Sequence, residues 1–267
     1  MPRISHTISI KTKDQIKIMQ EGGSLLSSVK EKVRGIINDG VNAEEVENLT
    51  TALIEKVGGK PSFKMVSGYH WSTCVNVNEG LVHGIPKKET VFKKGDLVSV
   101  DMGMYYKGFH TDTSFSVAIN PDSETERFLA VGEKALINAI NQVNLGKRIY
   151  DLSEVIEVTV TKSKYSPIKA LVGHGIGKNL HEEPQIPCFT QGSRETTPII
   201  KDGMALAIEV MYAKGSDEVE VEEDGWTIAM RDGKISALFE ETVACTAEGP
   251  FVLTQPDMAS VREAVSV

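Results

Sequence analysis

The sequence is poor in cysteine and has no long apolar run. Its three cysteines, Cys74, Cys188 and Cys245, are odd in number and widely spaced among 267 residues. This pattern predicts neither a disulfide framework nor a zinc-knuckle site, and it favours a reducing compartment. No stretch approaches the ~18 to 20 apolar residues that a membrane span needs, and residues 1–6 lack the apolar core of a signal peptide. We therefore expect a cytoplasmic protein that does not enter the membrane.

The chain also has fewer basic than acidic residues. The chain has 29 Lys and Arg against 37 Asp and Glu, a net charge of −8. Because binding to nucleic acid of any sequence needs a basic surface, this balance argues against such a function. A chain of this length can bury a large hydrophobic core, and we expect residues 1–267 to form a single catalytic domain.

The order of predicted elements repeats once along the chain. Each half has a helix, a glycine break, a second capped helix and then strands. Capping-box spacings or acidic starts predict helices that begin at Thr12, Asn42, Ser123 and Asp151. We infer an α+β fold with two halves related by a pseudo-twofold axis, about 1–120 and 121–267, whose strands form one central antiparallel sheet.

Two runs rich in Val, Tyr, Phe and Thr flank a Lys-Gly pair at 107–108. This pattern predicts a β-hairpin with a tight turn. Counted about Tyr106-Lys107, Asp101 and Asp112 are expected opposite each other, or nearly so, on the same face. Like charges across a strand pair repel each other, and a bound cation would remove that penalty. A lone Asp is most simply a solvated or capping residue, but a facing pair between apolar runs favours a metal site.

The second half contains acidic residues in apolar surroundings. Glu209 lies within an apolar strand, so its carboxylate must be paired, protonated or metal-bound. Glu240 and Glu241 repeat this anomaly, and strand alternation allows at most one of them to point inward. His174 lies between two glycines, which indicates either a backbone close to a bound group or a flexible loop with a surface histidine.

Together these residues form an oxygen-rich set with a single imidazole. Four carboxylates are too many for a structural zinc site, which prefers Cys and His. They suit two adjacent divalent cations of the Mn, Fe, Co or Zn type, the arrangement that metalloaminopeptidases use. His83 and His181 are candidates for substrate contacts, and neither lies in the HExxH pattern of zincins.

Over nearly its whole length, the sequence resembles the type I methionine aminopeptidases of the pita-bread fold. The resemblance rests on a combination of motifs: Asn78-Glu79, His83-Gly84-Ile85-Pro86, Phe109-His110-Thr111-Asp112-Thr113-Ser114, Gly173-His174-Gly175-Ile176-Gly177, His181-Glu182-Glu183-Pro184, Ile208-Glu209, Asp224-Gly225-Trp226-Thr227 and Glu240-Glu241-Thr242. The interval from His181 to Glu209 is too short for the long insertion of type II enzymes. The resemblance implies that the metal ligands are Asp101, Asp112, His174, Glu209 and Glu240, with Glu240 favoured over Glu241.

The resemblance also implies roles for residues around the metals. His83 would hydrogen-bond the substrate near its scissile amide or terminal amine, and His181 would contact the peptide carbonyl. Glu209 would serve both as ligand and as proton acceptor for the attacking water. The pocket for the methionine side chain would include Cys74, Tyr69 and Trp226.

The implied activity is metal-dependent removal of the initiator methionine from nascent peptides with a small second residue, through a metal-bridging hydroxide. Methionyl peptides and nascent proteins are the expected partners, the ribosome is a candidate partner, and we expect a monomer. Three features depart from the family pattern: Glu241 replaces a frequent His, Thr111 replaces a frequent Gly, and residues 63–67 lack the usual Cys and Tyr of the pocket rim.

Two alternative functions remain open. One is an Xaa-Pro aminopeptidase or dipeptidase of the same fold, although such relatives carry a further histidine before the HE motif, where this chain has Lys178-Asn179. The other is a binding protein of this fold that has lost its metals.

Overall fold

The computed structural model describes residues 7–255. Its four α-helices are α1 (Lys13–Arg34), α2 (Ala43–Lys56), α3 (Ser123–Ile140) and α4 (Ile149–Lys162), and its two short 3-10 helices are η1 (Phe63–Met65) and η2 (Arg194–Thr196). None of the helices in this part of the chain is both long and apolar enough to cross a membrane.

The helix starts agree with the sequence in the first half and shift in the second. Thr12 and Asn42 are the N-caps of α1 and α2, as predicted. Helix α3 is capped by Asp122 instead of Ser123, because the Asp122 carboxylate accepts the N–H of Thr125 at 2.7 Å. Helix α4 begins two residues before Asp151, whose carboxylate accepts the backbone N–H of the N-cap residue.

Ten strands form one antiparallel sheet that runs through both halves. Its main path is β1-β4-β5-β12-β9-β7-β8, with β2, β13 and β6 paired to β4, β12 and β9. These strands are β1 (Lys60–Pro61), β2 (Thr73–Val77), β4 (Leu97–Tyr106), β5 (Phe109–Ala118), β6 (Ser166–Pro167), β7 (Val172–Gly175), β8 (Glu182–Pro187), β9 (Ala205–Ala213), β12 (Ser236–Thr246) and β13 (Gly249–Val252). A smaller sheet contains β10 (Val219–Val221), β11 (Ile228–Met230) and β3 (Gly80–Val82).

The two halves of the large sheet meet where β5 pairs with β12, which we call the seam. Only two residue pairs are in register there, Ser114 with Glu240 and Thr113 with Glu241. Side-chain hydroxyls extend the pairing on both sides. Ser116 Oγ donates to the carbonyl oxygen of Leu238 and accepts its N–H, while Thr242 Oγ1 does the same for Asp112. The seam is thus a short backbone ladder lengthened by side chains.

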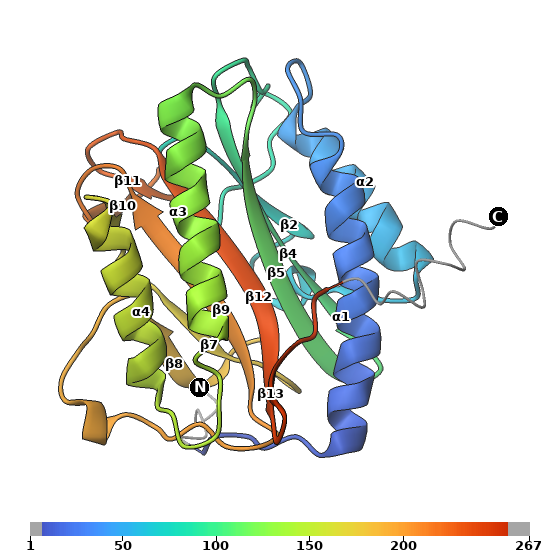
Figure 1. Ribbon diagram of the computed structural model, residues 1–267. Helices are drawn as coiled ribbons and strands as arrows, with labels where there is room; N and C mark the ends of the chain where they lie inside the picture. The colour runs from blue at the N-terminus through green and yellow to red at the C-terminus, as the bar shows by residue number, and fades with distance from the viewer. Residues whose placement is uncertain (1–6, 256–267) are drawn as a thin grey trace.

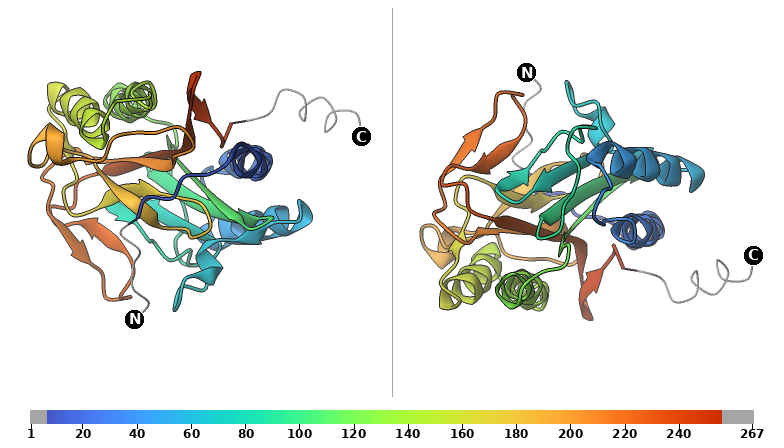
Figure 2. Two further views of the ribbon diagram at one scale, coloured as in Figure 1. Left: turned by 90° about the horizontal axis from the view of Figure 1, so that it is seen from below. Right: turned by 90° about the horizontal axis from the view of Figure 1, so that it is seen from above.

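The helices cover one face of the sheet. In Figure 1, α1 packs on β4 and β5, with α2 beside it near β1 and β2, whereas α3 packs on β9 and β12, with α4 beside it near β6 and β8. Helix α3 approaches closely because it has glycine at position 132, where a Cβ would lie 2.5 Å from the Phe239 ring. Since strand neighbours alternate in direction, Glu240 points to the opposite face from Phe239. The views in Figure 2 show the helices as two separate pairs, α1 with α2 and α3 with α4.

The predicted α+β architecture with a central antiparallel sheet is confirmed, but the hairpin register differs from the count made on the sequence. The turn is centred on Lys107-Gly108, whose φ angles of 46° and 94° allow the left-handed two-residue turn of a hairpin. Asp101 therefore pairs with Ser114, and Asp112 pairs with Gly103. The two aspartates share a face, as expected, but they are diagonal neighbours. The assignment of residues 1–267 to a single domain stays a prediction.

Candidate metal centre

The first half of the chain supplies two buried aspartates. Asp101 on β4 and Asp112 on β5 are 7% and 4% exposed. Asp112 Oδ1 accepts the N–H of Thr113 at 3.1 Å. Glycine at position 103 keeps the space beside Asp112 open, since a Cβ there would lie 3.2 Å from Asp112 Oδ1.

The second half supplies two glutamates that face each other directly. Glu209 on β9 pairs with Glu240 on β12, so the directly opposed acids of this sheet are these two and not the hairpin aspartates. Glu240 is 1% exposed, and its chain neighbour Glu241 points to the other face, towards Lys30. The structure therefore places Glu240, and not Glu241, among the acids.

His174 on β7 completes the set. Its Nδ1 lies 2.8 Å from the carbonyl oxygen of Gly175. Because a carbonyl can only accept a hydrogen bond, Nδ1 carries the proton and Nε2 keeps its lone pair, the form in which histidine binds metals. Burial, together with the nearby His181, lowers the pKa of His174 to about 3, so the ring is neutral at physiological pH.

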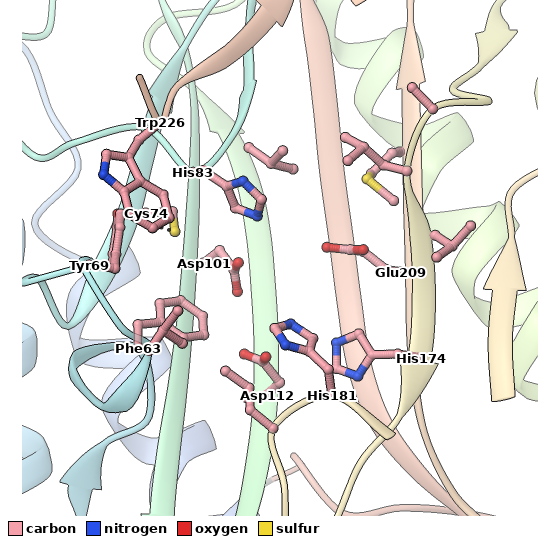
Figure 3. Close-up of a pocket in the computed structure, with 17 residues that line it drawn as sticks. Phe63, Tyr69, Cys74, His83, Asp101, Asp112, His174, His181, Glu209 and Trp226 are labelled. Carbon is pink, nitrogen blue, oxygen red and sulfur yellow. Dashed lines mark hydrogen bonds between the residues drawn. The ribbon is translucent and has the colours of Figure 1, made fainter. Parts of the chain in front are cut away.

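The five residues form two overlapping groups. Potential ligand atoms of Asp112, His174 and Glu240 all lie within 4.8 Å of one another, and so do those of Asp101, Glu209 and Glu240. Glu240 belongs to both groups. Figure 3 shows the side chains of Asp101, Asp112, Glu209 and His174 pointing towards one another. The structure thus brings together all five residues that the sequence singled out as ligands.

The electrostatics of this cluster fit bound cations. Among residues 7–255, no ion pair involves any of the four carboxylates, and Asp101 Oδ1 and Glu240 Oε1 are buried without a hydrogen-bond partner. Burial raises the pKa of Asp112 to about 7, and burial with the charge of Asp112 raises the pKa of Glu209 to about 8. Such a donor set, rich in carboxylates with one imidazole, suits divalent cations of the Mn, Fe, Co or Zn type.

A cavity of about 320 Å³ adjoins the cluster. One lobe is apolar and is lined by Phe63, Val66, Tyr69, Cys74 and Trp226. The Tyr69 and Trp226 rings are 5.1 Å apart and meet edge to face. The Tyr69 hydroxyl donates to the Thr73 carbonyl oxygen at 2.8 Å, which fixes the ring in the wall. All three residues expected from the resemblance, Tyr69, Cys74 and Trp226, line this lobe.

The sequence did not reveal the other lining residues. Phe63 and Val66 come from the segment whose family pattern is absent, and nothing in their spacing marks them as cavity residues. The cavity is also lined by Val82, Ala170, Leu171, Val172 and Met211. These are ordinary apolar positions in strands and loops, so only the three-dimensional arrangement identifies them.

His83 and His181 border the cavity from two different loops. Both side chains are exposed to it, and Figure 3 shows them on either side of the acids. The His181 ring lies 4.5 Å from the His174 ring, edge to face. Partial desolvation lowers the pKa of both residues, and the nearby His181 lowers that of His83 further. Neutral imidazoles can donate or accept a hydrogen bond to a bound peptide.

Metallopeptidase family M24 matches residues 17–247 of the sequence. The chain belongs to this family. Methionine aminopeptidase 1 of Bacillus subtilis is 37% identical over 249 residues, which cover 93% of this chain and 99% of that protein. The methionine aminopeptidase of Clostridium perfringens is 34% identical, over 92% of this chain and 98% of that one.

Solved structures agree with this assignment. The methionine aminopeptidase of Thermotoga maritima superposes with a TM-score of 0.90 at 40% identity, covering 93% of this chain and all of that chain. Prolidase from Pyrococcus furiosus superposes with a TM-score of 0.75 at 22% identity and is covered over 66% of its length, a similarity that shows the shared fold. The predicted pita-bread fold and the resemblance to methionine aminopeptidases are therefore confirmed.

Proposed function

We propose that this M24 metallopeptidase removes N-terminal methionine from peptides. The observation that carries the proposal is the pair of ligand groups sharing Glu240, beside an apolar lobe that Trp226 and Tyr69 help to line. The named relatives support the same activity, because they match over nearly their full length.

The five residues of the cluster would hold two divalent cations, of Co, Mn, Fe or Zn. Asp112 and His174 would bind one, Asp101 and Glu209 the other, and Glu240 would bind both. When bound, the cations would polarise the scissile carbonyl and lower the pKa of the attacking water. The uncompensated buried carboxylates support this assignment because they lack any protein counter-charge within the described residues.

Glu209 would also accept the proton of the attacking water and pass it to the leaving amine. A general base must reach the reacting atoms, and Glu209 is half-buried and lines the cavity, unlike the buried Glu240. His181 would donate a hydrogen bond to the peptide carbonyl as negative charge develops on its oxygen. His83 would hydrogen-bond the substrate near its scissile amide or terminal amine.

The apolar lobe would bind the methionine side chain. Its aromatic rings and the Cys74 thiol offer a polarisable surface, which suits a thioether. Peptides with a small second residue would be preferred, because the cleft beside the cluster is bordered by His83 and His181 and would clash with bulky side chains.

The wider setting is part of the same proposal. Nascent proteins as substrates would place the enzyme in the cytoplasm, with the ribosome as a candidate partner, and we propose a monomeric single catalytic domain. The Xaa-Pro alternative is less favoured, because the prolidases share only the fold with this chain.

The activity can be tested with a peptide pair. The metal-free protein, reloaded with Co²⁺ or Mn²⁺, should release methionine from Met-Ala-Ser much faster than from Met-Leu-Ser, and EDTA should stop the reaction. Equal rates on the two peptides, or turnover that does not depend on metal, would contradict the proposal.

A further inference from the structure

A lysine from helix α1 reaches the seam of the sheet. The Lys30 side chain is 4% exposed, and its Nζ lies 2.5 Å from Glu241 Oε1 and 2.8 Å from Thr113 Oγ1. Thr113 belongs to β5 and Glu241 to β12. One buried ammonium group therefore contacts a residue from each side of the seam.

Both contacts are chain neighbours of proposed metal ligands. The Thr113 N–H donates to Asp112 Oδ1, and the Thr113 hydroxyl lies 2.9 Å from the Glu240 carbonyl oxygen. Because neighbouring strand residues point to opposite faces, Lys30 acts from the helix face while Asp112 and Glu240 point to the cavity face.

The backbone ladder of the seam is short at this point, and the hydroxyls of Ser116 and Thr242 extend it on either side. Only two residue pairs are in register between β5 and β12, and the two halves contribute one carboxylate each to the group with His174. A slip of either strand would move Asp112 relative to Glu240. Buried ion pairs are weak stabilisers in general, and fixing a particular register is one of their attested uses.

The Glu241 side of the contact is also held. Thr254 Oγ1 donates to Glu241 Oε2, and the same hydroxyl accepts the N–H of Thr242. Glu241, the residue that replaces the frequent histidine of the family, is thus fixed by Lys30 on one oxygen and by hydroxyls on the other. Its charge is balanced locally.

We propose that Lys30 is a positioning residue of the metal centre: through Thr113 and Glu241 it holds β5 and β12 where Asp112 and Glu240 can bind one cation. The inference rests on the metal centre of the proposed function and adds a residue outside it. Replacing groups that orient metal ligands typically weakens metal binding by about 10- to 100-fold.

The test compares Lys30→Met with Lys32→Met, an exposed lysine on the same helix. Each metal-free protein is titrated with Co²⁺, and the visible absorption of the bound ion reports its coordination geometry. We expect Lys30→Met to bind Co²⁺ about 10- to 100-fold more weakly, with a shifted spectrum, and Lys32→Met to match the unmutated protein.

A double variant separates positioning from stability. Lys30→Met with Glu241→Met removes both charges, so it should fold even if Lys30→Met alone does not. Because Thr113 still lacks its ammonium partner, Co²⁺ binding should stay weak. Binding and spectrum equal to the unmutated protein, in either folded variant, would overturn the proposal while leaving the metal centre intact. No Co²⁺ binding by the unmutated protein would overturn the metal centre itself, and the proposal with it.

Discussion

Glu240 and Glu241 are adjacent residues on β12, yet their carboxylates have opposite surroundings. Glu241 faces helix α1 and pairs with Lys30, Thr113 and Thr254. Glu240 faces the cavity, directly across from Glu209, and one of its oxygens has no hydrogen-bond partner. On the helix face the chain itself neutralises Glu241, whereas on the cavity face none of the four acids has an ion pair among residues 7–255.

This difference teaches where a cation belongs. A buried acid without a partner costs free energy, so a protein keeps such a cluster only where something else stabilises it. On the helix face that stabilisation is built into the chain. On the cavity face we assign it to divalent cations.

The largest contrast is expected in turnover. Glu240→Gln removes the carboxylate shared by both ligand groups, so kcat/KM for Met-Ala-Ser should fall at least ~1000-fold, equivalent to about 4 kcal/mol. Glu241→Gln leaves all proposed ligands in place and should cost ~100-fold or less. Steady-state kinetics with added Mn²⁺ on protein verified as folded by circular dichroism would measure both. A similar loss in the two variants would erase the distinction between the faces.

The same two substitutions should change stability in opposite directions. In EDTA at pH 8, Glu241→Gln leaves the Lys30 ammonium buried and unpaired, and should lower the free energy of unfolding by about 3 kcal/mol. We expect a loss near the low end of the range for broken buried ion pairs, because the Glu241 side chain is 21% exposed. Glu240→Gln relieves repulsion with three other acids and should raise the free energy of unfolding. Urea denaturation would give both values, and destabilisation by both substitutions would contradict the account.

The stability of the metal-free protein should depend on pH because the buried acids of the cavity face titrate at unusually high pH. Burial raises the pKa of Asp112 to about 7 and, with the charge of Asp112, raises that of Glu209 to about 8, so the folded state holds protons that the unfolded state releases near pH 4. The contribution of Asp112 and Glu209 to the free energy of unfolding of the metal-free protein should therefore be largest below about pH 4 to 5. That stability is lost as pH rises towards 8.

Urea midpoints in EDTA between pH 5 and pH 8 would check this dependence. The decline should be shallower in Glu240→Gln, because that variant has one ionisable acid fewer, and unchanged in the exposed-lysine control Lys32→Met. A midpoint that rises with pH in the unmutated protein would show that the acids are not the groups that titrate.

The smallest effect is expected at a second buried ion pair, away from the seam. Lys11 Nζ lies 2.7 Å from Glu182 Oε2, and both side chains are buried. The pair holds the loop that carries His181, because Glu182 also accepts the N–H of Asn179. Lys11→Met should lower kcat about tenfold and leave Mn²⁺ affinity unchanged, whereas the exposed Lys13→Met should alter neither. Weaker Mn²⁺ binding in Lys11→Met would show that this pair, too, supports the metal ligands.

Much of the candidate site could be predicted from the sequence, because acids inside apolar strands are conspicuous. Glu209 lies between residues that are fully buried. The apolar runs around Asp101 and Asp112 predict the two strands of the hairpin that carry them. Strand alternation alone left Glu240 and Glu241 undecided, and the family resemblance favoured the one that the structure places among the acids.

The remainder depended on contacts between distant segments. The hairpin register shifted because the turn is centred on Lys107-Gly108, one residue later than the count assumed. Lys30 looks like any helical lysine in the sequence, and only the packing of α1 against the seam buries it beside a partner 211 positions away. Phe63 and Val66 likewise become cavity residues only through the path of their loop.

The central claim is that the cavity face of β12 binds two divalent cations that share Glu240. Equilibrium dialysis of the full chain against Mn²⁺, followed by metal analysis, tests it most directly. The account predicts two Mn²⁺ per chain at saturation, and a clear loss of bound metal in Glu240→Gln but not in Lys32→Met. One ion per chain or none in the unmutated protein, or undiminished binding in Glu240→Gln, would contradict it.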